Sequence, residues 1–372
     1  MMVGNFLHFP KGNGSYTVAE NLARYVPSIC NPWAVGENSS QIYNDGTFPV
    51  FLSHPQSSGK RFSNLNRREY QRYLQEIEKA ISDVPEHDLA LVHHGFILAR
   101  KLSERFPVIS YLHGTEMLAL QSGLPDYVAE AIHSGISVSK EVLVMSEKQK
   151  TLAEKLFCKD LKKEPIVVTG GFDNNIFYPC PDHNFYDRVG IADEKRKILF
   201  AGRITPEKGI DDLIRAFSDH SFSYDKQLII VGDGNEKPGL MDLAMRLGID
   251  ARFLPAQRQD ELARIMSSSD LFVLPSHYES FGLVCVESLA CGTPVVGSDV
   301  GVLEDLIIPG RGGYVFKREE DYERTARNIR DAIVKSLHLD TLSFNAHAQM
   351  IREVYSWDTI SHRFQRIIND NK

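Results

Sequence analysis

The stretch LFVLPSHYESFGLVCVESLACGTPVVGS, residues 271–298, decides the fold class of this chain. Its apolar beginning, Leu271 to Pro275, predicts a buried parallel strand, and the residues after Ser280 predict a helix that leads into a second strand, PVVGS. A strand, a helix and a strand in this order are typical of an α/β protein. We therefore expect Glu279 at the carboxyl edge of a parallel sheet, where open α/β sheets bind ligands.

Two glutamates in this stretch, Glu279 and Glu287, indicate what the ligand is like. A carboxylate only accepts hydrogen bonds, so the pair suits a ligand rich in hydroxyl donors, such as a sugar or a ribose. The helix that begins near Phe281 and Gly282 would point free N–H groups and the positive end of its dipole at a bound anion. The alternative is a solvated loop charge and a solvated helix residue, and the Cys291 to Pro294 turn that follows favours the site.

Two cations, Arg203 and Lys208, follow another predicted strand, ILFAG, and precede a helix that begins near Gly209. They should therefore lie at the same sheet edge as Glu279. Fixed cations there would stabilise the charge that grows on a departing diphosphate. The alternative is an exposed cation pair on a solvated loop. The sequence has no D-x-D triplet to hold a divalent ion, so we predict no metal.

The same alternation of short apolar runs and helical patterns occurs twice along the chain, which predicts two α/β domains. The boundary should lie near Asp173, giving domains 1–172 and 173–356, because residues 170–187 mix glycine, proline, asparagine and aspartate without periodicity. The tail, 357–372, has apolar residues at helical spacing. The predicted strands are VGNFLHF, FPVFL, DLALV, VISYL, EVLVMS and PIVVT in the first half, and KILFA, QLIIV, ARFLP, LFVLP and PVVGS in the second.

Composition excludes several classes of protein. The 372 residues are 42% hydrophobic and 24% charged, which is ordinary for a globular protein with two cores. A net charge of −7 argues against nucleic acid as a partner. The five cysteines form no C-x-x-C pair, and we see no basic leader and no apolar run of about 18 residues. We therefore expect a cytoplasmic protein with reduced thiols.

Several motifs in order resemble a known family. ILFAGRITPEKGIDDLIRAF (198–217) is similar to its Gly-Arg loop and Lys-Gly helix entrance, VVTGGFDNNIFYP (167–179) to its interdomain segment, and LIIVGDG (228–234) to its next strand and turn. The glutamate pair is similar to its E-x7-E motif. The chain thus resembles the retaining glycosyltransferases of family 4, which have the GT-B fold, over nearly its whole length.

The resemblance implies two Rossmann-like domains that face each other across a deep cleft, the first binding the acceptor and the second the nucleotide sugar. The last helix would cross back to the first domain, with Trp357 near the crossing. The implied enzyme is a hexosyltransferase without a cofactor. It would move a glucosyl or N-acetylglucosaminyl group from a nucleotide sugar, with UDP as the default, to a hydroxyl acceptor with retention.

The resemblance also assigns roles to residues. Glu287 would hold the ribose hydroxyls and Glu279 those of the donor sugar, while backbone groups near Leu254 would contact the base. Many relatives carry a glycine where this chain has Leu254-Pro255-Ala256, which leaves the base open. The implied catalytic residues are Arg203, Lys208, Glu279 and His113. The implied donor-binding residues are Gly14, Arg203, Lys208, Leu254, Ala256, Glu279, Ser280, Phe281, Gly282, Leu283 and Glu287.

The first half offers fewer signals. Gly12 and Gly14 precede a helix, either as a plain turn or as a loop that faces the cleft and touches the ligand; the pattern lacks the third glycine of a dinucleotide fingerprint. His113 follows a strand at the family's histidine position. His93 and Glu116 are our candidate acceptor-binding residues. For His94, which also ends a predicted strand, a structural role and a role on the acceptor side both stay open. Ser146 should cap a helix.

The acceptor stays open between two alternatives. Acidic residues Glu116, Asp126 and Glu130 would suit an amine-bearing acceptor such as an aminocyclitol or amino sugar. The basic start of residues 59–81 would instead suit a peripheral contact with an anionic membrane that carries a lipid-linked acceptor. Either feature can also be a solvated helix. Two other functions remain as alternatives: a GT-B nucleotide-sugar epimerase, and a catalytically inactive nucleotide-sugar-binding protein.

Overall fold

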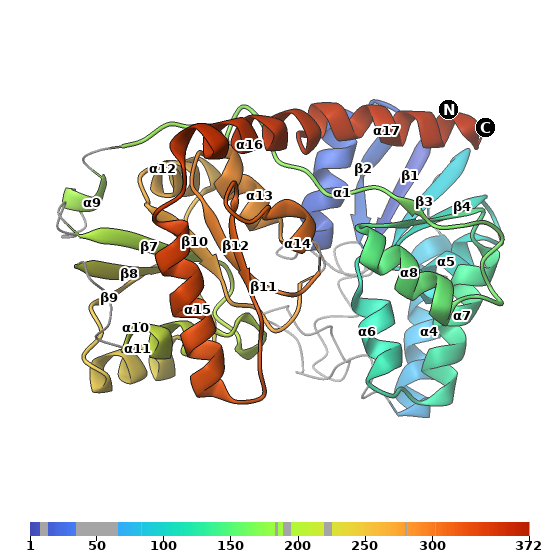
Figure 1. Cartoon of the computed structure of the whole chain (residues 1–372). Helices are drawn as coiled ribbons and strands as arrows, with labels where there is room; N and C mark the ends of the chain where they lie inside the picture. The colour runs from blue at the N-terminus through green and yellow to red at the C-terminus, as the bar shows by residue number, and fades with distance from the viewer. Residues whose placement is uncertain are drawn as a thin grey trace. The chain divides into compact units, whose positions relative to one another are not determined.

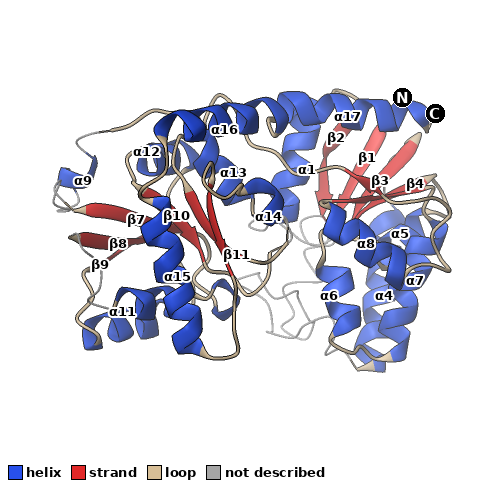
Figure 2. Ribbon diagram, in the orientation of Figure 1, coloured by secondary structure: helices blue, strands red, loops and turns tan. Residues whose placement is uncertain are grey.

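The chain folds into two compact α/β units. The computed structural model describes residues 1–7, 14–34, 66–82, 84–182, 185–188, 195–218, 225–279, 281–301 and 303–371. Unit 1 contains Met1–Gly170 together with Trp357–Lys372, and unit 2 contains Gly171–Ser356 (Figure 1). Each unit has a six-stranded sheet of parallel strands with helices between them (Figure 2). The predicted α/β class is confirmed.

The sheet of unit 1 has the strand order β2-β1-β3-β4-β5-β6. Its elements are β1 (Val3–Leu7), α1 (Gly14–Tyr25), β2 (Ile29–Ala34), α4 (Arg67–Ser82), β3 (Leu89–His93), α5 (Ile97–Leu102), β4 (Val108–Tyr111), α6 (Thr115–Gln121), α7 (Asp126–Val138), β5 (Glu141–Val144), α8 (Glu147–Leu156), β6 (Ile166–Val167) and α17 (Trp357–Asp370).

The sheet of unit 2 has the strand order β12-β11-β10-β7-β8-β9. Its elements are α9 (Phe185–Arg188), β7 (Arg196–Ala201), the 3-10 turn η2 (Pro206–Lys208), α10 (Ile210–Phe217), β8 (Lys226–Val231), α11 (Lys237–Arg246), β9 (Ala251–Leu254), α12 (Gln259–Ser267), β10 (Leu271–Leu274), α13 (Leu283–Ala290), β11 (Val295–Ser298), α14 (Leu303–Leu306), β12 (Gly313–Phe316), α15 (Tyr322–Ser336) and α16 (Thr341–Val354).

The central strands were predictable because they are buried along their whole length and consist mostly of apolar residues. Strands β3, β4, β5 and β10 are buried at every position. Sequence analysis missed β2 and β12, and both lie at a sheet edge. The β2 sequence, ICNPWA, contains asparagine and proline, which are rare inside sheets but acceptable at an edge. The predicted strand FPVFL lies outside the described residues.

Helix α17 belongs to unit 1, where it packs against α1. Its buried residues recur at helical spacing: Trp357, Ile360, Ser361, Phe364, Ile367 and Ile368. The ring of Phe364 meets that of Tyr111 edge-on, with centroids 5.5 Å apart, and Lys140 Nζ donates to Asn371 O at 3.1 Å. These contacts fix the last helix against β4 and its neighbours. Among the described residues, no helix combines the length and apolar character needed to cross a membrane.

The order of strands in unit 2 reverses between β7 and β10, which lie side by side with Leu271 paired to Ile198. From β7 the chain runs outward to β8 and β9, and from β10 it runs outward the other way to β11 and β12. Loops at such a reversal leave the sheet in opposite directions, so open α/β sheets bind ligands there. The loops after β7 and β10 carry Lys208 and Glu279.

Candidate functional site

The structure brings together two predicted catalytic residues of unit 2 that are 71 positions apart in the sequence. Lys208 Nζ donates to Glu279 Oε1 in an ion pair, and Ser276 Oγ donates to the same oxygen at 2.8 Å. The two charged side chains are only 17% and 13% exposed. Screening by solvent is weak at such burial, so the pair fixes each charge in place more firmly than a surface pair would.

Two glycines allow neighbouring loops to approach the segment that carries Glu279. Gly209, with a left-handed φ of 61°, lies where a Cβ would come within 2.2 Å of Pro275 O. Gly301, with φ of 59°, lies where a Cβ would come within 2.3 Å of Glu279 O. A side chain at either position would push the Glu279 segment away, and the backbone conformation itself favours glycine.

The other predicted residues at this edge are placed as follows. Arg203 is exposed, and within the described part of the chain it makes no hydrogen bond or ion pair. Gly282, at φ 79°, is the N-cap of α13, and no side chain caps that helix. Phe281 is buried at 2% exposure, and Leu283 begins the helix. Ser280 lies outside the described residues.

Glu287, on α13, is half-buried, and burial raises the pKa of its carboxyl group to about 7. We find no hydrogen-bond or ion-pair partner for this carboxylate within the described ranges. A carboxylate that is desolvated without compensation gains from a ligand that donates hydrogen bonds to it. The ribose role that we predicted for Glu287 is chemically consistent with this position.

Near the predicted base contacts, sequence analysis missed a small ion-pair cluster. Ala256 N donates to Asp233 Oδ2 at 2.9 Å, and Lys237 Nζ donates to Asp233 Oδ1 at 2.8 Å. Both bonds lower the pKa of Asp233, and the bond from Lys237 has the larger effect. Leu254 O accepts from Gly232 N at 3.1 Å. Contact between a base and the Ala256 N–H would therefore require Asp233 to move away. The LIIVGDG segment contained the signal, since Asp233 lies in the turn after a predicted strand.

In unit 1, a buried network joins two predicted residues, His93 and His113, to one that sequence analysis missed, Asn5. Asn5 Nδ2 donates to Ala19 O at 2.9 Å, so its Oδ1 faces His93 Nε2, which lies 2.9 Å away. His93 Nδ1 is 2.8 Å from His113 Nε2. Asn5 Oδ1 can only accept, which assigns the single proton of a neutral His93 to Nε2. The lone pair on His93 Nδ1 then assigns the His113 proton to Nε2.

The histidines of this network are neutral at pH 7. Burial, and after it the neighbouring His94, lowers the pKa of His93 to about 3. Burial also holds the pKa of His113 well below its ordinary value. His94 Nδ1 is 3.0 Å from Glu116 Oε1. Glu116 Oε2 is buried without a hydrogen-bond partner among the residues that the structure describes.

The remaining predictions for unit 1 have different outcomes. His93 and Glu116 are both 0% exposed, so neither presents surface to which an acceptor could bind directly. Gly14 begins α1, and a Cβ there would have open space around it. Gly12 lies outside the described residues. The predicted role of Ser146 is confirmed: its side chain caps α8 by accepting from Gln149 N at 3.2 Å.

One group of side chains in the described ranges has the spacing of a cation site: Asp211, Asp212 and His277, whose ligand atoms lie within 4.8 Å of one another. Arg318 already pairs with Asp212 Oδ2 there. A guanidinium at this oxygen opposes the binding of a second positive charge. These residues therefore fit a metal poorly, and the absence of a metal stays a prediction.

Two parallel sheets in separate units, with cations and carboxylates at a strand-order reversal, define a two-domain α/β protein of the Rossmann-like kind. Residues 183–371 match the model of the family described as glycosyl transferases group 1, so the chain belongs to this family. The predicted family is confirmed.

Three relatives illustrate the match. An uncharacterized glycosyltransferase of Methanocaldococcus jannaschii is 31% identical over 69% of this chain and 67% of its own length. N-acetyl-alpha-D-glucosaminyl L-malate synthase of Bacillus anthracis is 28% identical over 61% of each chain. D-inositol 3-phosphate glycosyltransferase of Thermobispora bispora is 34% identical over 55% of this chain and 50% of its own. For the last two, the match thus spans less than two thirds of the relative.

Solved structures show the fold over the whole chain. Sucrose-phosphate synthase from Thermosynechococcus elongatus superposes with a TM-score of 0.76 at 18% identity, covering 100% of this chain and 99% of that one. Anabaena HepE in complex with UDP and glucose gives 0.74 at 19% identity, with full coverage of both chains. The predicted GT-B fold is confirmed.

Proposed function

We propose that this glycosyltransferase moves a hexosyl group from a UDP-linked sugar to a hydroxyl of a small acceptor, with retention of anomeric configuration. The observation that carries the proposal is the Lys208–Glu279 pair at the strand-order reversal of unit 2. In this pair a cation and a carboxylate, which can accept hydrogen bonds from hydroxyls, lie side by side at a strand-order reversal, where open α/β sheets bind ligands. A nucleoside-diphosphate sugar has both matching groups, namely a diphosphate and a hydroxyl-rich ring.

Lys208 can serve the ligand without leaving Glu279. An ammonium group has three N–H donors, and the described contacts of Lys208 use one of them, on Glu279 Oε1. The other two remain for phosphate oxygens. Arg203 adds an exposed guanidinium from the same loop, whose planar fork suits a phosphate. Glu279 Oε2 remains for a sugar hydroxyl, since Ser276 and Lys208 both use Oε1.

The chemical step breaks the bond between the anomeric carbon and the diphosphate oxygen and forms a bond from that carbon to the acceptor oxygen. The transition state resembles an oxocarbenium ion, so negative charge accumulates on the departing phosphate. Lys208 and Arg203 would stabilise this charge more in the transition state than in the ground state. We propose that the acceptor attacks from the face that the phosphate leaves, and that the phosphate takes the acceptor proton.

The printed names of relatives support the finer donor choice. HepE is described with UDP and glucose, and the Bacillus anthracis relative is named for N-acetyl-glucosaminyl transfer. In this chain, Glu287 would bind the ribose, because its unpaired carboxylate gains hydrogen bonds from two hydroxyls. Uracil would lie near Leu254 and contact carbonyl groups, since Ala256 N is taken by Asp233.

Unit 1 would bind the acceptor. Because His93 and Glu116 are fully buried, we assign them an indirect role: His93 orients His113, and Glu116 orients His94. The relatives named for L-malate and D-inositol 3-phosphate support a small hydroxyl acceptor. A peripheral membrane contact and a cytoplasmic location stay predictions, since most of the basic start of 59–81 lies outside the described residues.

A panel of UDP-, GDP- and ADP-sugars tests the proposal, with thermal stability and donor hydrolysis as the two measurements. A ligand at a hundredfold excess over its dissociation constant raises the stability of the folded state by about 2.7 kcal/mol. We expect UDP-glucose or UDP-N-acetylglucosamine to stabilise the protein and to be hydrolysed slowly without acceptor. If no sugar nucleotide of the panel stabilises the protein, the proposal is contradicted. If the product has the inverted anomeric configuration, only the retaining mechanism is wrong.

A further inference from the structure

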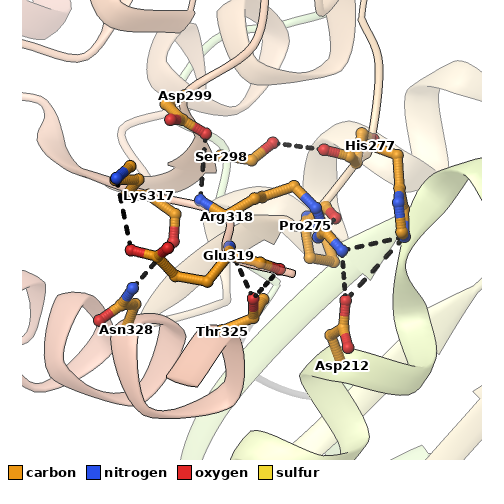
Figure 3. A network of polar contacts seen from close by, with 11 residues as sticks. Asp212, Pro275, His277, Ser298, Asp299, Lys317, Arg318, Glu319, Thr325 and Asn328 are labelled. Carbon is orange, nitrogen blue, oxygen red and sulfur yellow. Dashed lines mark hydrogen bonds and ion pairs between the residues drawn. The ribbon is translucent and has the colours of Figure 1, made fainter. Parts of the chain in front are cut away.

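Arg318, just after β12, is the centre of a polar network in unit 2 (Figure 3). Its Nη1 donates to Pro275 O at 2.7 Å, and its Nη2 lies 3.0 Å from His277 Nε2 and pairs with Asp212 Oδ2. Its backbone N donates to Asp299 Oδ1 at 3.2 Å. The side chains of Arg318 and Asp212 are only 16% and 7% exposed. One guanidinium thus joins three chain segments that are far apart in the sequence.

Two of these segments carry the Lys208–Glu279 pair. Asp212 lies in the first turn of α10, directly after Lys208 and Gly209. Pro275 begins the segment that ends at Glu279. By holding both, Arg318 fixes the distance between the loop of the cation and the loop of the carboxylate.

Further bonds hold the Glu279 segment in the same place. His277 N donates to Glu207 O at 2.8 Å, so the residue before Lys208 contacts the Glu279 segment through the backbone. Ser298 Oγ donates to Ser276 O at 2.6 Å, and Ser276 in turn contacts Glu279. Arg318 is the charged member of this set, and its contacts with Asp212 and Pro275 link both loops to the end of β12.

The chemistry of the network requires an arginine. A guanidinium presents donors in a rigid plane, so it can reach Pro275 O and Asp212 Oδ2 at once from two nitrogens. The single nitrogen of a lysine cannot match this geometry. His277 Nε2 accepts from Arg318 only when the imidazole is neutral. Partial desolvation, and after it the charge of Arg318, lowers the pKa of His277 accordingly.

We propose that Arg318 is a positioning residue for sugar transfer: through Asp212 and Pro275 it sets the placement of Lys208 against Glu279, without touching the substrate itself. This inference rests on the proposed function, in which Lys208 and Glu279 contact the donor. Misplacement of a catalytic group by about 1 Å can lower turnover about 100-fold.

The test compares Arg318→Ala with Lys317→Ala, a control that removes the neighbouring cation. Lys317 is 71% exposed and contacts only Glu319, at 3.5 Å, among its ion-pair partners in the described chain. UDP titration by calorimetry counts the competent sites and gives Kd, and turnover of UDP-glucose is then expressed per UDP-binding site. We expect Arg318→Ala to lower kcat per site about 100-fold while Kd for UDP stays within about threefold. Lys317→Ala should leave both near the wild-type values.

Two more variants separate positioning from stability. Asp212→Asn keeps the shape of the side chain and removes its charge, so it should lower kcat per site about tenfold even where Arg318→Ala folds poorly. Arg318→Ala added to Lys208→Met should cause little further loss, because residues that act through one another are not additive.

The inference is wrong if kcat per UDP-binding site stays within twofold of wild type in both Arg318→Ala and Asp212→Asn. It is also wrong if the losses from Arg318→Ala and Lys208→Met multiply. A wild-type protein that binds no UDP and turns over no UDP-sugar removes the proposed function, and this inference with it, before any variant is measured.

Discussion

The buried Asn5–His93–His113 network of unit 1 is uncharged, whereas the polar cluster of unit 2 carries paired charges. In unit 1, His93 and His113 lie buried as uncharged rings joined to Asn5. In unit 2, Lys208 pairs with Glu279 and Arg318 pairs with Asp212. Neutral rings can orient one another and leave no net charge for a ligand. Fixed charges suit a diphosphate. We therefore propose that unit 2 supplies the electrostatic part of catalysis.

One group in each unit should also respond to pH, and the two responses have opposite signs. His93 of unit 1 is buried with a lowered pKa, so its contribution to stability is lost in acid. Glu287 of unit 2 has a raised pKa, so its contribution to stability is lost as the pH rises. Four experiments can break or sharpen this comparison.

The largest effect is expected for Lys208→Met. The variant keeps the apolar stem and removes the ammonium that would stabilise the departing diphosphate. Loss of one such contact costs about 2.7 to 4 kcal/mol of barrier, so turnover of a UDP-sugar should fall about 100- to 1000-fold. Steady-state kinetics measure this, with Arg246→Ala as the control because Arg246 is 66% exposed and pairs only with Asp242 in the described chain. Equal losses in the two variants would contradict an electrostatic role for unit 2.

Glu287→Gln should separate stability from binding. The carboxyl has a pKa of about 7 in the folded protein against 4.5 as its ordinary value, so between these values the folded state binds more protons than the unfolded chain. Stability is therefore lost as pH rises from 4.5 through 7, by about 3 kcal/mol in full. The neutral glutamine should restore this stability at pH 8 and change little at pH 4.5.

The effect of Glu287→Gln on stability is measured at both pH values by unfolding the protein in urea, with hydrogen exchange of peptides from unit 2 as the signal. The same variant should weaken UDP binding, because an amide accepts ribose hydroxyls less strongly than a carboxylate does. A variant that is no more stable than wild type at pH 8 would show that Glu287 is not desolvated as the structure has it.

For His93 in unit 1 the sign is reversed. His93 has a pKa of about 3 in the folded protein, against an ordinary value of 6.5 in the unfolded chain, so the folded state binds fewer protons between these values. The contribution of His93 to the free energy of unfolding is therefore present above pH 6.5 and lost as the pH falls. At pH 5 the loss is about 2 kcal/mol for this one histidine. Both tryptophans, Trp33 and Trp357, belong to unit 1, so their fluorescence reports its unfolding in urea.

His93→Gln is the matched variant for this measurement. Its amide N–H can still donate to Asn5, but it cannot take up a proton, so the decline between pH 7 and pH 5 should become shallower. An unchanged decline in the variant would assign the acid response to other groups, such as His113.

The smallest effect is expected for Asp233→Ala. Asp233 is 60% exposed and holds Lys237 and the Ala256 N–H. Exposed pairs contribute little, so Kd for UDP should change by less than about fivefold, and turnover should stay near wild type. Calorimetric titration with UDP and GDP checks this. A large and unequal change for the two nucleotides would place Asp233 in direct contact with the base.

Sequence analysis predicted those parts that depend on local pattern. Apolar runs gave the central strands, and the position of Glu279 and Lys208 after two of them placed both at one sheet edge, where they pair. The role of Ser146 as a helix cap was predictable in the same way, because it depends only on the residues next to it. Each of these features needs only the residues within a few positions of it, together with the rule that parallel strands end at the same edge.

The rest depends on tertiary packing, which no local pattern encodes. Arg318 and Asp212 are 106 positions apart, and their pairing follows from the placement of β12 and α10. Glu116, at the start of a helix, would be exposed in most folds, but here it is buried against His94. Strands β2 and β12 are edge strands: β2 has a mixed composition, ICNPWA, and β12 has only four residues, GYVF, of which the middle two are half-buried.

Hydrogen exchange with and without UDP tests the central claim most directly, namely that unit 2 holds the diphosphate through Lys208 beside Glu279. Saturating UDP should slow exchange in peptides that cover residues 203–209 and 281–287 of the wild-type protein. In Lys208→Met, at the same UDP concentration, the first peptide should lose much of this protection. Protection that appears only in other parts of the chain, or that is unchanged in Lys208→Met, would contradict the claim.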